Sequence, residues 1–214
     1  SAASDVYKRQ GIDTKEYQKG NFFSLRNLED SKRIRKKISE VQTITIIGAG
    51  FIGLEIATTA LQLNKDVTII ENSENVMGRS ISKDLSKWLI NYYTKSGIKF
   101  IFNKSFKSFK SDENSIMNVV LSDDTKINSG MVLISAGSQP NDLLFKSIKV
   151  NEFNKIKVNS FLETNIDDIY AIGDCCFFDY YSKEVRLESI QNATDQAKTV
   201  ATVSYTHLTL PTKA

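Results

Sequence analysis

The stretch Val41–Glu55, VQTITIIGAGFIGLE, decides the fold of this chain. Thr43–Ile47 is a run of mostly β-branched residues, which is typical of a strand buried on both faces. The run breaks at GAG (48–50), and apolar residues return at helical spacing from Phe51 onward. A strand, a glycine turn and a helix in this order are the setting in which GxGxxG binds a dinucleotide. The alternative, an incidental glycine turn, does not account for the strand and the helix on its two sides.

Each glycine of the motif has a role in this interpretation. Gly48 permits the tight turn, Gly50 lets the backbone approach a pyrophosphate, and Gly53 lets the helix pack closely on the strand. The helix start, at Phe51 and Ile52, presents backbone N–H groups and a partial positive charge to the phosphates. The sequence therefore predicts a dinucleotide pyrophosphate at this turn.

A second predicted strand, Asp66–Glu71, ends in a carboxylate. Glu71 lies 21 positions after Gly50, close to the spacing of about 20 expected for the acid that binds the adenosine ribose. A 2′-phosphate would meet this carboxylate where an NADP-binding site offers an arginine. Glu71 therefore favours NADH over NADPH.

The composition is ordinary for a soluble globular protein: 214 residues, 41% hydrophobic and 25% charged, with a net charge of +3. No apolar run approaches the roughly 18 residues of a membrane-spanning helix, and the charge balance gives no electrostatic case for nucleic acid. The two cysteines, Cys175 and Cys176, are adjacent and cannot form a disulfide framework, which fits a reducing cytoplasm. We expect both to be buried thiols.

Both ends of the chain resemble translated synthetic DNA. Ser1–Gln10, SAASDVYKRQ, is what a transposon-end sequencing adaptor would encode, and Val203–Thr212, VSYTHLTLPT, resembles the reverse complement of the same adaptor. We therefore expect residues 1–10 and 203–214 to be artefacts, which also removes the single histidine, His207, from consideration. On this interpretation the chain is an internal fragment of a longer protein.

Periodicity predicts further elements: a strand over 22–26, a helix over 31–39 capped by Asn27 or Asp30, a helix over 82–96, a small antiparallel meander over 106–127, strands over 131–135, 156–158 and 168–174, and a helix over 191–201. We expect Ile34 and Ile38 to lie on the buried side of the first helix, and Trp88 to pack in the core from the second. Gly173-Asp174 ends the predicted 168–174 strand. Its carboxylate would therefore lie at the sheet edge where ligands of α/β proteins bind.

Several separated motifs together resemble the FAD-dependent pyridine nucleotide–disulfide oxidoreductase superfamily. They are IIGAGFIGLEIA (46–57), VTIIE (67–71), AGSQPN (136–141) and ETNIDDIYAIGDC (163–175). VMGRSIS (76–82) and RLESIQNATDQA (186–197) narrow the resemblance to the ferredoxin reductase branch. Members of that branch pass electrons from NADH through a flavin to an iron–sulfur protein.

The resemblance implies an α/β fold in which an NADH-binding domain is inserted into an FAD-binding domain that is split in sequence. Residues 11–40 would end the first FAD segment, 41–141 would form the Rossmann-like NAD(P)H-binding domain with its antiparallel meander, and 142–202 would be part of the second FAD segment. The glycine motif of the first FAD segment is missing. We therefore expect the isolated chain to bind FAD poorly and to be inactive.

The resemblance also implies roles for single residues beyond the glycine turn. Glu55 would lie near the nicotinamide, although favourable placement in the helix dipole explains it equally well. Asp174 would hydrogen-bond the ribityl chain of FAD, a role compatible with capping a helix. Arg26 would lie near the FAD phosphates, and Ile190 would offer backbone contacts beside the flavin. Gly137, in the AGSQPN turn, completes the cofactor-binding set; no catalytic residue and no metal ligand are expected.

The predicted function is hydride transfer from NADH to FAD, followed by electron transfer to a ferredoxin-type iron–sulfur partner, in the cytoplasm. Two alternatives stay open. The chain could come from another branch, a nitrite reductase flavoprotein or a disulfide reductase, or it could be a non-catalytic NADH-binding module. RLESIQNATDQA argues against the module, because a sensor of NADH needs no residues around a flavin.

Overall fold

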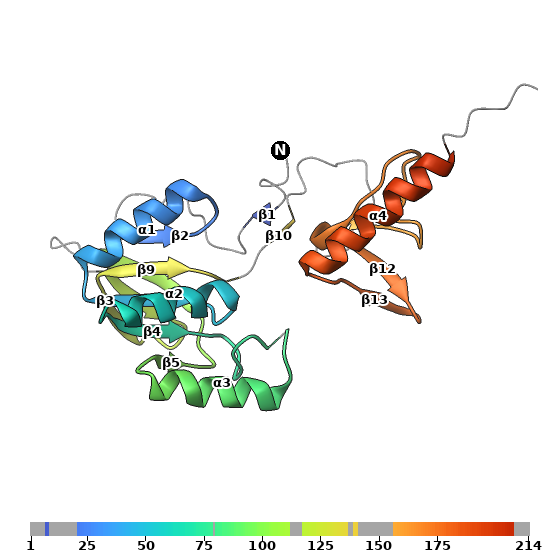
Figure 1. The fold of residues 1–214 in the computed structure, drawn as a ribbon. Coiled ribbons are helices and arrows are strands. Elements are labelled where there is room, and N and C mark those ends of the chain that lie inside the picture. The colour runs from blue at the N-terminus through green and yellow to red at the C-terminus, as the bar shows by residue number, and fades with distance from the viewer. Residues whose placement is uncertain are drawn as a thin grey trace, which may run out of the picture. The chain divides into compact units, whose positions relative to one another are not determined.

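The computed structural model describes residues 7–8, 21–78, 80–111, 117–136, 139–140 and 156–207. They fall in two compact units (Figure 1). One unit is Arg9–Gly137, and the other combines Ser1–Lys8 with Ser138–Ala214.

The larger unit is built on a five-stranded parallel sheet with β3 at its centre. The strand order is β2 (Phe22–Ser24), β9 (Met131–Ile134), β3 (Thr43–Ile47), β4 (Asp66–Ile70) and β5 (Lys99–Ile101). Ile44, Ile46 and Ile69 are fully buried, as the β-branched run at 43–47 predicts for a strand covered on both faces. The carboxyl ends of all five strands lie at one edge, where the glycine turn follows β3.

Helices cover one face of this sheet (Figure 1). They are α1 (Leu28–Glu40), α2 (Phe51–Gln62) and α3 (Lys83–Lys95). Asn27 caps α1, since its Oδ1 accepts from the N–H of Asp30 at 2.8 Å, and the helix therefore begins before the predicted residue 31. Ile34 and Ile38 are buried as predicted. Because β2 and α1 pack into this unit, it extends upstream of the boundary expected at residue 41.

An antiparallel meander covers the other face, as the alternating pattern predicted. It consists of β6 (Phe106–Ser111), β7 (Met117–Leu121) and β8 (Lys126–Ser129). Val119 and Leu121 are fully buried against Ile47, Ile70 and Phe22 of the parallel sheet. The unit is therefore a three-layer α/β/β structure of Rossmann type.

The rotation of α3 differs from the prediction. Trp88 is 59% exposed and stacks on Tyr92, with ring centroids 5.5 Å apart, so the expectation that it packs in the core is wrong. Ser86 is instead the fully buried residue of this helix, and its hydroxyl donates to the carbonyl of Val76 at 2.9 Å. The helical period alone does not distinguish the stripe through Trp88 from the stripe through Ser86. The stripe through Ser86 faces inward, where this hydrogen bond reaches a loop ten residues upstream.

The smaller unit contains the Gly-Asp motif. A three-stranded sheet joins β11 (Ile156–Lys157), β12 (Cys176–Tyr180) and β13 (Lys183–Val185), and α4 (Ile190–His207) follows. A short antiparallel pair, β1 (Tyr7–Lys8) with β10 (Gln139–Pro140), also belongs to it. The helix extends past the predicted residue 201, since no glycine or proline interrupts it before 207. Among the described residues, no helix is long and apolar enough to cross a membrane.

The predicted strand over 168–174 does not form. Asp168 has a positive φ of 62°, and the N–H of Ile169 donates to the carbonyl of Ile166 at 3.2 Å, so this segment turns. Tyr170 makes only an isolated bridge, with Glu163. The strand begins later, at β12, after a 3-10 turn η3 (Gly173–Cys175). The Gly-Asp pair therefore precedes a strand instead of ending one.

Candidate functional site

The first glycine of the 48–53 turn is required by the backbone. Gly48 has a φ of +102°, and its N–H donates to the carbonyl of Ile70 at 2.8 Å. A Cβ at this position would lie 2.9 Å from backbone atoms of Ala136. Both its conformation and its close approach to the loop after β9 therefore select glycine.

The third glycine is required by packing. A Cβ on Gly53 would lie 2.3 Å from the carbonyl oxygen of Gly48 and 2.6 Å from Oγ of Ser135. The hydroxyl of Ser135 is within hydrogen-bond distance of the carbonyls of Gly48, at 2.8 Å, and Ile47, at 3.1 Å. Ser135 thus ties the end of β9 to the turn. Sequence reasoning did not identify this residue, and its position directly after a buried strand is the only signal that marks it.

The second glycine is different, because the protein's own packing does not require it. A Cβ on Gly50 would meet nothing within 4 Å, and its φ is −83°. Side chains other than glycine adopt this φ readily. The space over Gly50 is therefore open at the sheet edge where α/β proteins bind ligands, and a Cβ would fill it.

Helix α2 begins beside this open space. Its first internal hydrogen bond runs from the N–H of Leu54 to the carbonyl of Gly50, at 3.0 Å. The N–H groups of Phe51 and Ile52 come earlier and take no part in the helical ladder, so they can serve a ligand. Glu55 is exposed on the same helix. It is the fifth helical residue, past the first turn, which weakens the helix-dipole explanation of its position.

Glu71 follows β4 and reaches back to the turn. Its Oε2 accepts from the N–H of Ala49 at 2.9 Å. Its Oε1 accepts from both the N–H and the hydroxyl of Ser73, each at 3.0 Å. The structure thus brings the predicted ribose-binding acid directly onto the glycine turn.

In the smaller unit, Asp174 lies in η3 between Gly173 and the two cysteines. Gly173 has a φ of +74°, and its N–H donates to Oε1 of Gln196, on α4, at 2.6 Å. Burial raises the pKa of the Asp174 carboxyl; the Glu188 carboxylate also raises it, and Arg186 lowers it. Arg186 pairs with Glu188, and its Nε is buried without a hydrogen-bond partner. Both charges act on the carboxyl to which the resemblance gives a role at the FAD ribityl chain.

The two cysteines are free thiols with little nucleophilic character. Cys176 is buried, and burial raises its pKa to about 12. Cys175 is only partly buried, against the expectation, although burial raises its pKa too. A reactive cysteine requires the opposite shift. Neither thiol therefore has the properties of a redox nucleophile.

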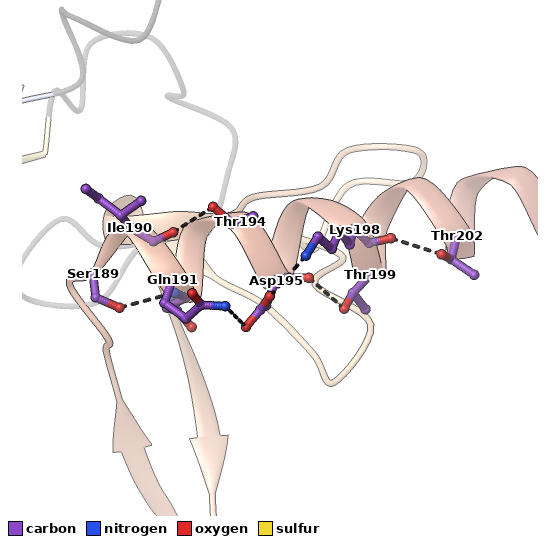
Figure 2. Close-up of polar contacts among 9 residues, drawn as sticks. Ser189, Ile190, Gln191, Thr194, Asp195, Lys198, Thr199 and Thr202 are labelled. Atoms are coloured by element: carbon purple, nitrogen blue, oxygen red, sulfur yellow. Dashed lines mark hydrogen bonds and ion pairs between the residues drawn. The ribbon is translucent and has the colours of Figure 1, made fainter.

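The start of α4 exposes a large apolar side chain. Ile190 is 88% exposed, and its carbonyl accepts from the hydroxyl of Thr194 at 2.8 Å (Figure 2). The hydroxyl of Ser189 caps the helix by accepting from the N–H of Asn192 at 3.1 Å. Polar contacts such as Gln191 to Asp195, at 2.9 Å, continue along the next turns (Figure 2). The helix start is thus well ordered, with an isoleucine facing outward.

The predicted site residues divide between the two units. Gly48, Gly50, Phe51, Ile52, Gly53, Glu55 and Glu71 gather at the carboxyl edge of the parallel sheet. Arg26 lies at the same edge, after the outermost strand β2, and its N–H donates to Oδ2 of Asp30 at 3.0 Å. Asp174 and Ile190 belong to the smaller unit. Gly137 lies outside the described residues.

Residues 7–197 match the protein family described as pyridine nucleotide-disulphide oxidoreductase. Rubredoxin-NAD(+) reductase of Pseudomonas putida is 31% identical over 179 residues, which are 83% of this chain and 46% of that protein. Putidaredoxin reductase of the same organism is 30% identical over 187 residues, 86% of this chain and 44% of that protein. The chain thus spans about half the length of the curated relatives it matches.

Solved structures show a similar likeness. The ferredoxin reductase of the CYP199A2 system from Rhodopseudomonas palustris has a TM-score of 0.83 at 28% identity, covering 92% of this chain and 50% of that chain. The covalent putidaredoxin reductase–putidaredoxin complex has a TM-score of 0.80 at 27% identity, covering 93% of this chain and 49% of that chain.

Proposed function

The chain belongs to the pyridine nucleotide-disulphide oxidoreductase family, and from this membership we propose that it binds NADH at the glycine turn as part of a flavoprotein reductase. The proposed reaction is hydride transfer from NADH to FAD, followed by transfer of single electrons to a ferredoxin-type iron–sulfur protein. Relatives named rubredoxin-NAD(+) reductase and putidaredoxin reductase support this class of acceptor.

The observation that carries the proposal is the open space over Gly50 beside the carboxylate of Glu71. Two of the three motif glycines are explained by folding, so the remaining one needs a ligand that approaches the backbone closely. A pyrophosphate fits this requirement, because the N–H groups of Phe51 and Ile52 precede the helical ladder and the helix dipole favours an anion. The acid at 71 then lies where the adenosine ribose of the same ligand would reach.

The residues of this site would bind and orient the coenzyme. Glu71 would accept hydrogen bonds from the ribose hydroxyls and disfavour a 2′-phosphate, which gives the preference for NADH. Glu55, exposed on α2, would orient the nicotinamide carboxamide. NADH and FAD, when bound, supply the redox chemistry, and the protein contributes positioning. No general acid or base is needed for this step.

The FAD side of the proposal rests on the smaller unit. The Asp174 carboxyl, held beside Arg186 and Glu188, would hydrogen-bond hydroxyls of the ribityl chain. The exposed start of α4 at Ile190 would offer backbone contacts to the flavin ring. The raised pKa of Asp174 is compatible with a carboxyl that both donates hydrogen bonds to hydroxyls and accepts them from hydroxyls.

Coenzyme titration of the full chain tests the proposal. Wild-type protein should bind NADH more tightly than NADPH, as measured by isothermal titration calorimetry. Glu71→Gln keeps the size and one acceptor but removes the charge, and it should weaken NADH binding by roughly 10- to 100-fold, since a hydrogen bond to a charged acceptor contributes about 1.5–3 kcal/mol. Its affinity for NADPH should not fall in parallel. A wild-type chain that binds neither nucleotide, or binds both equally, contradicts the proposal.

A further inference from the structure

The carboxylate of Glu71 is held at both oxygens by groups of the protein itself. Oε2 accepts from the N–H of Ala49 at 2.9 Å, and Oε1 accepts from the N–H and the hydroxyl of Ser73 at 3.0 Å each. Three of its roughly four lone-pair positions are thereby used. The side chain therefore keeps one orientation relative to the glycine turn.

Ser73 is itself held by the loop that follows β5. The N–H of Asn103, in the loop after β5, donates to the carbonyl of Ser73 at 3.2 Å. Further along, the N–H of Met77 donates to the carbonyl of Ala49 at 2.9 Å, so the segment after Ser73 is tied to the same turn that holds Glu71. The serine hydroxyl is thus presented to the carboxylate from a rigid support.

The hydroxyl of Ser73 also has a second acceptor. It lies 2.9 Å from the carbonyl oxygen of Asn75 and 3.0 Å from Oε1 of Glu71, and it has a single hydrogen to donate. A ribose hydroxyl can donate to the remaining lone-pair position, on Oε2, while the Ser73 hydroxyl stays on Oε1. A 2′-phosphate carries no comparable donor for the carboxylate, so it gains no hydrogen bond there.

We propose that Ser73 is a positioning residue that holds the Glu71 carboxylate toward the ribose and so sets the discrimination between NADH and NADPH. This inference rests on the proposed function. With the hydroxyl present, the carboxylate stays where a 2′-phosphate would meet it. Without the hydroxyl, one of the two anchors on Oε1 is lost, and the carboxylate is no longer held toward the ribose.

The test compares Ser73→Ala, Ser73→Thr and the wild-type chain by calorimetric titration with NADH and with NADPH. Ser73→Ala should weaken NADH binding roughly three- to tenfold while changing NADPH binding less than about twofold, so that the NADH preference falls. Ser73→Thr keeps a hydroxyl and should restore the preference to within about twofold. Ser96→Ala removes a serine hydroxyl that bonds only within α3, to the carbonyl of Tyr92 at 2.9 Å, and should leave both affinities unchanged.

A purely structural role for Ser73 would change both affinities by the same factor, and an unaltered ratio in Ser73→Ala would overturn the inference. The failure of the underlying function is distinguishable from this result. If the wild-type chain shows no NADH preference, the proposed function fails. If it shows the preference and Ser73→Ala retains it in full, only the role of Ser73 fails.

Discussion

Gly50 offers the sharpest separation of folding from binding in this protein. In Gly50→Ala the new methyl group would meet no protein atom within 4 Å, and the φ of −83° suits alanine. Alanine restricts the unfolded chain, which stabilises by about 0.4–1 kcal/mol, whereas its weaker N-cap preference offsets a similar amount. The free energy of unfolding should therefore change by less than about 1 kcal/mol.

The same methyl group would occupy the space proposed for the pyrophosphate. Displacing the phosphate by the width of a methyl group should break at least one hydrogen bond from the helix-start N–H groups. Such a bond to a charged acceptor is worth about 1.5–3 kcal/mol, so NADH affinity should fall by roughly 10- to 100-fold. Calorimetric titration with NADH gives the affinity, and urea denaturation gives the stability of the same preparation.

Gly53→Ala is the matched contrast. Its Cβ would lie 2.3 Å from the Gly48 carbonyl, so we expect overpacking that costs about 1–3 kcal/mol of folding stability. Gly50→Ala should thus lose binding and keep stability, whereas Gly53→Ala should lose stability. Wild-type NADH affinity in a folded Gly50→Ala protein would refute the reasoning, because the open space would then have no ligand.

Two further predictions concern the thiols and the core. Burial raises the pKa of Cys176 to about 12 in the folded chain, whereas in the unfolded chain its pKa is near the ordinary 9.0. The free energy of unfolding should therefore fall as pH rises between these two values. Cys176→Ser should reduce this pH dependence, as measured by urea denaturation at alkaline pH. An unchanged alkaline slope in Cys176→Ser would contradict the assigned burial effect. Trp88→Ala, at a side chain that is 59% exposed, should lower the free energy of unfolding by less than about 1 kcal/mol. Ile46→Ala, at a fully buried side chain, should lower it by about 2–5 kcal/mol. Equal losses in denaturant titrations would mean that α3 faces inward with Trp88.

Local signals in the sequence were sufficient for the elements that surround the turn. The run at Thr43–Ile47 and the buried pair Ile34 and Ile38 are as predicted, because each depends on residues within one or two turns of chain. Of the two predicted caps, Asn27 and Asp30, the structure has Asn27. The position of Glu71 beside the glycine turn also agrees with its spacing from Gly50, since the length of the intervening helix fixes that distance.

Long-range contacts account for what the sequence did not predict. Ser135 is 87 residues from the Gly48 carbonyl that it bonds, and no local pattern marks such a pair. In α3 the inward-facing Ser86 donates to the carbonyl of Val76, and helical periodicity does not predict that contact. At 168–174, the apolar composition suggested a strand, but the backbone turns at Asp168, which has a positive φ.

The backbone of Ala49 links the glycine turn to the loop that carries Glu71. Its N–H donates to Glu71, and its carbonyl accepts from the N–H of Met77, each at 2.9 Å. The peptide groups next to Gly50 are therefore held by the same loop that carries Glu71, the proposed ribose-binding acid. A coenzyme would meet a turn and a carboxylate already in register, so little of its binding free energy would go to ordering the protein. Ala49, between Gly48 and Gly50, thus contributes through its backbone alone, which explains why a small side chain suffices there.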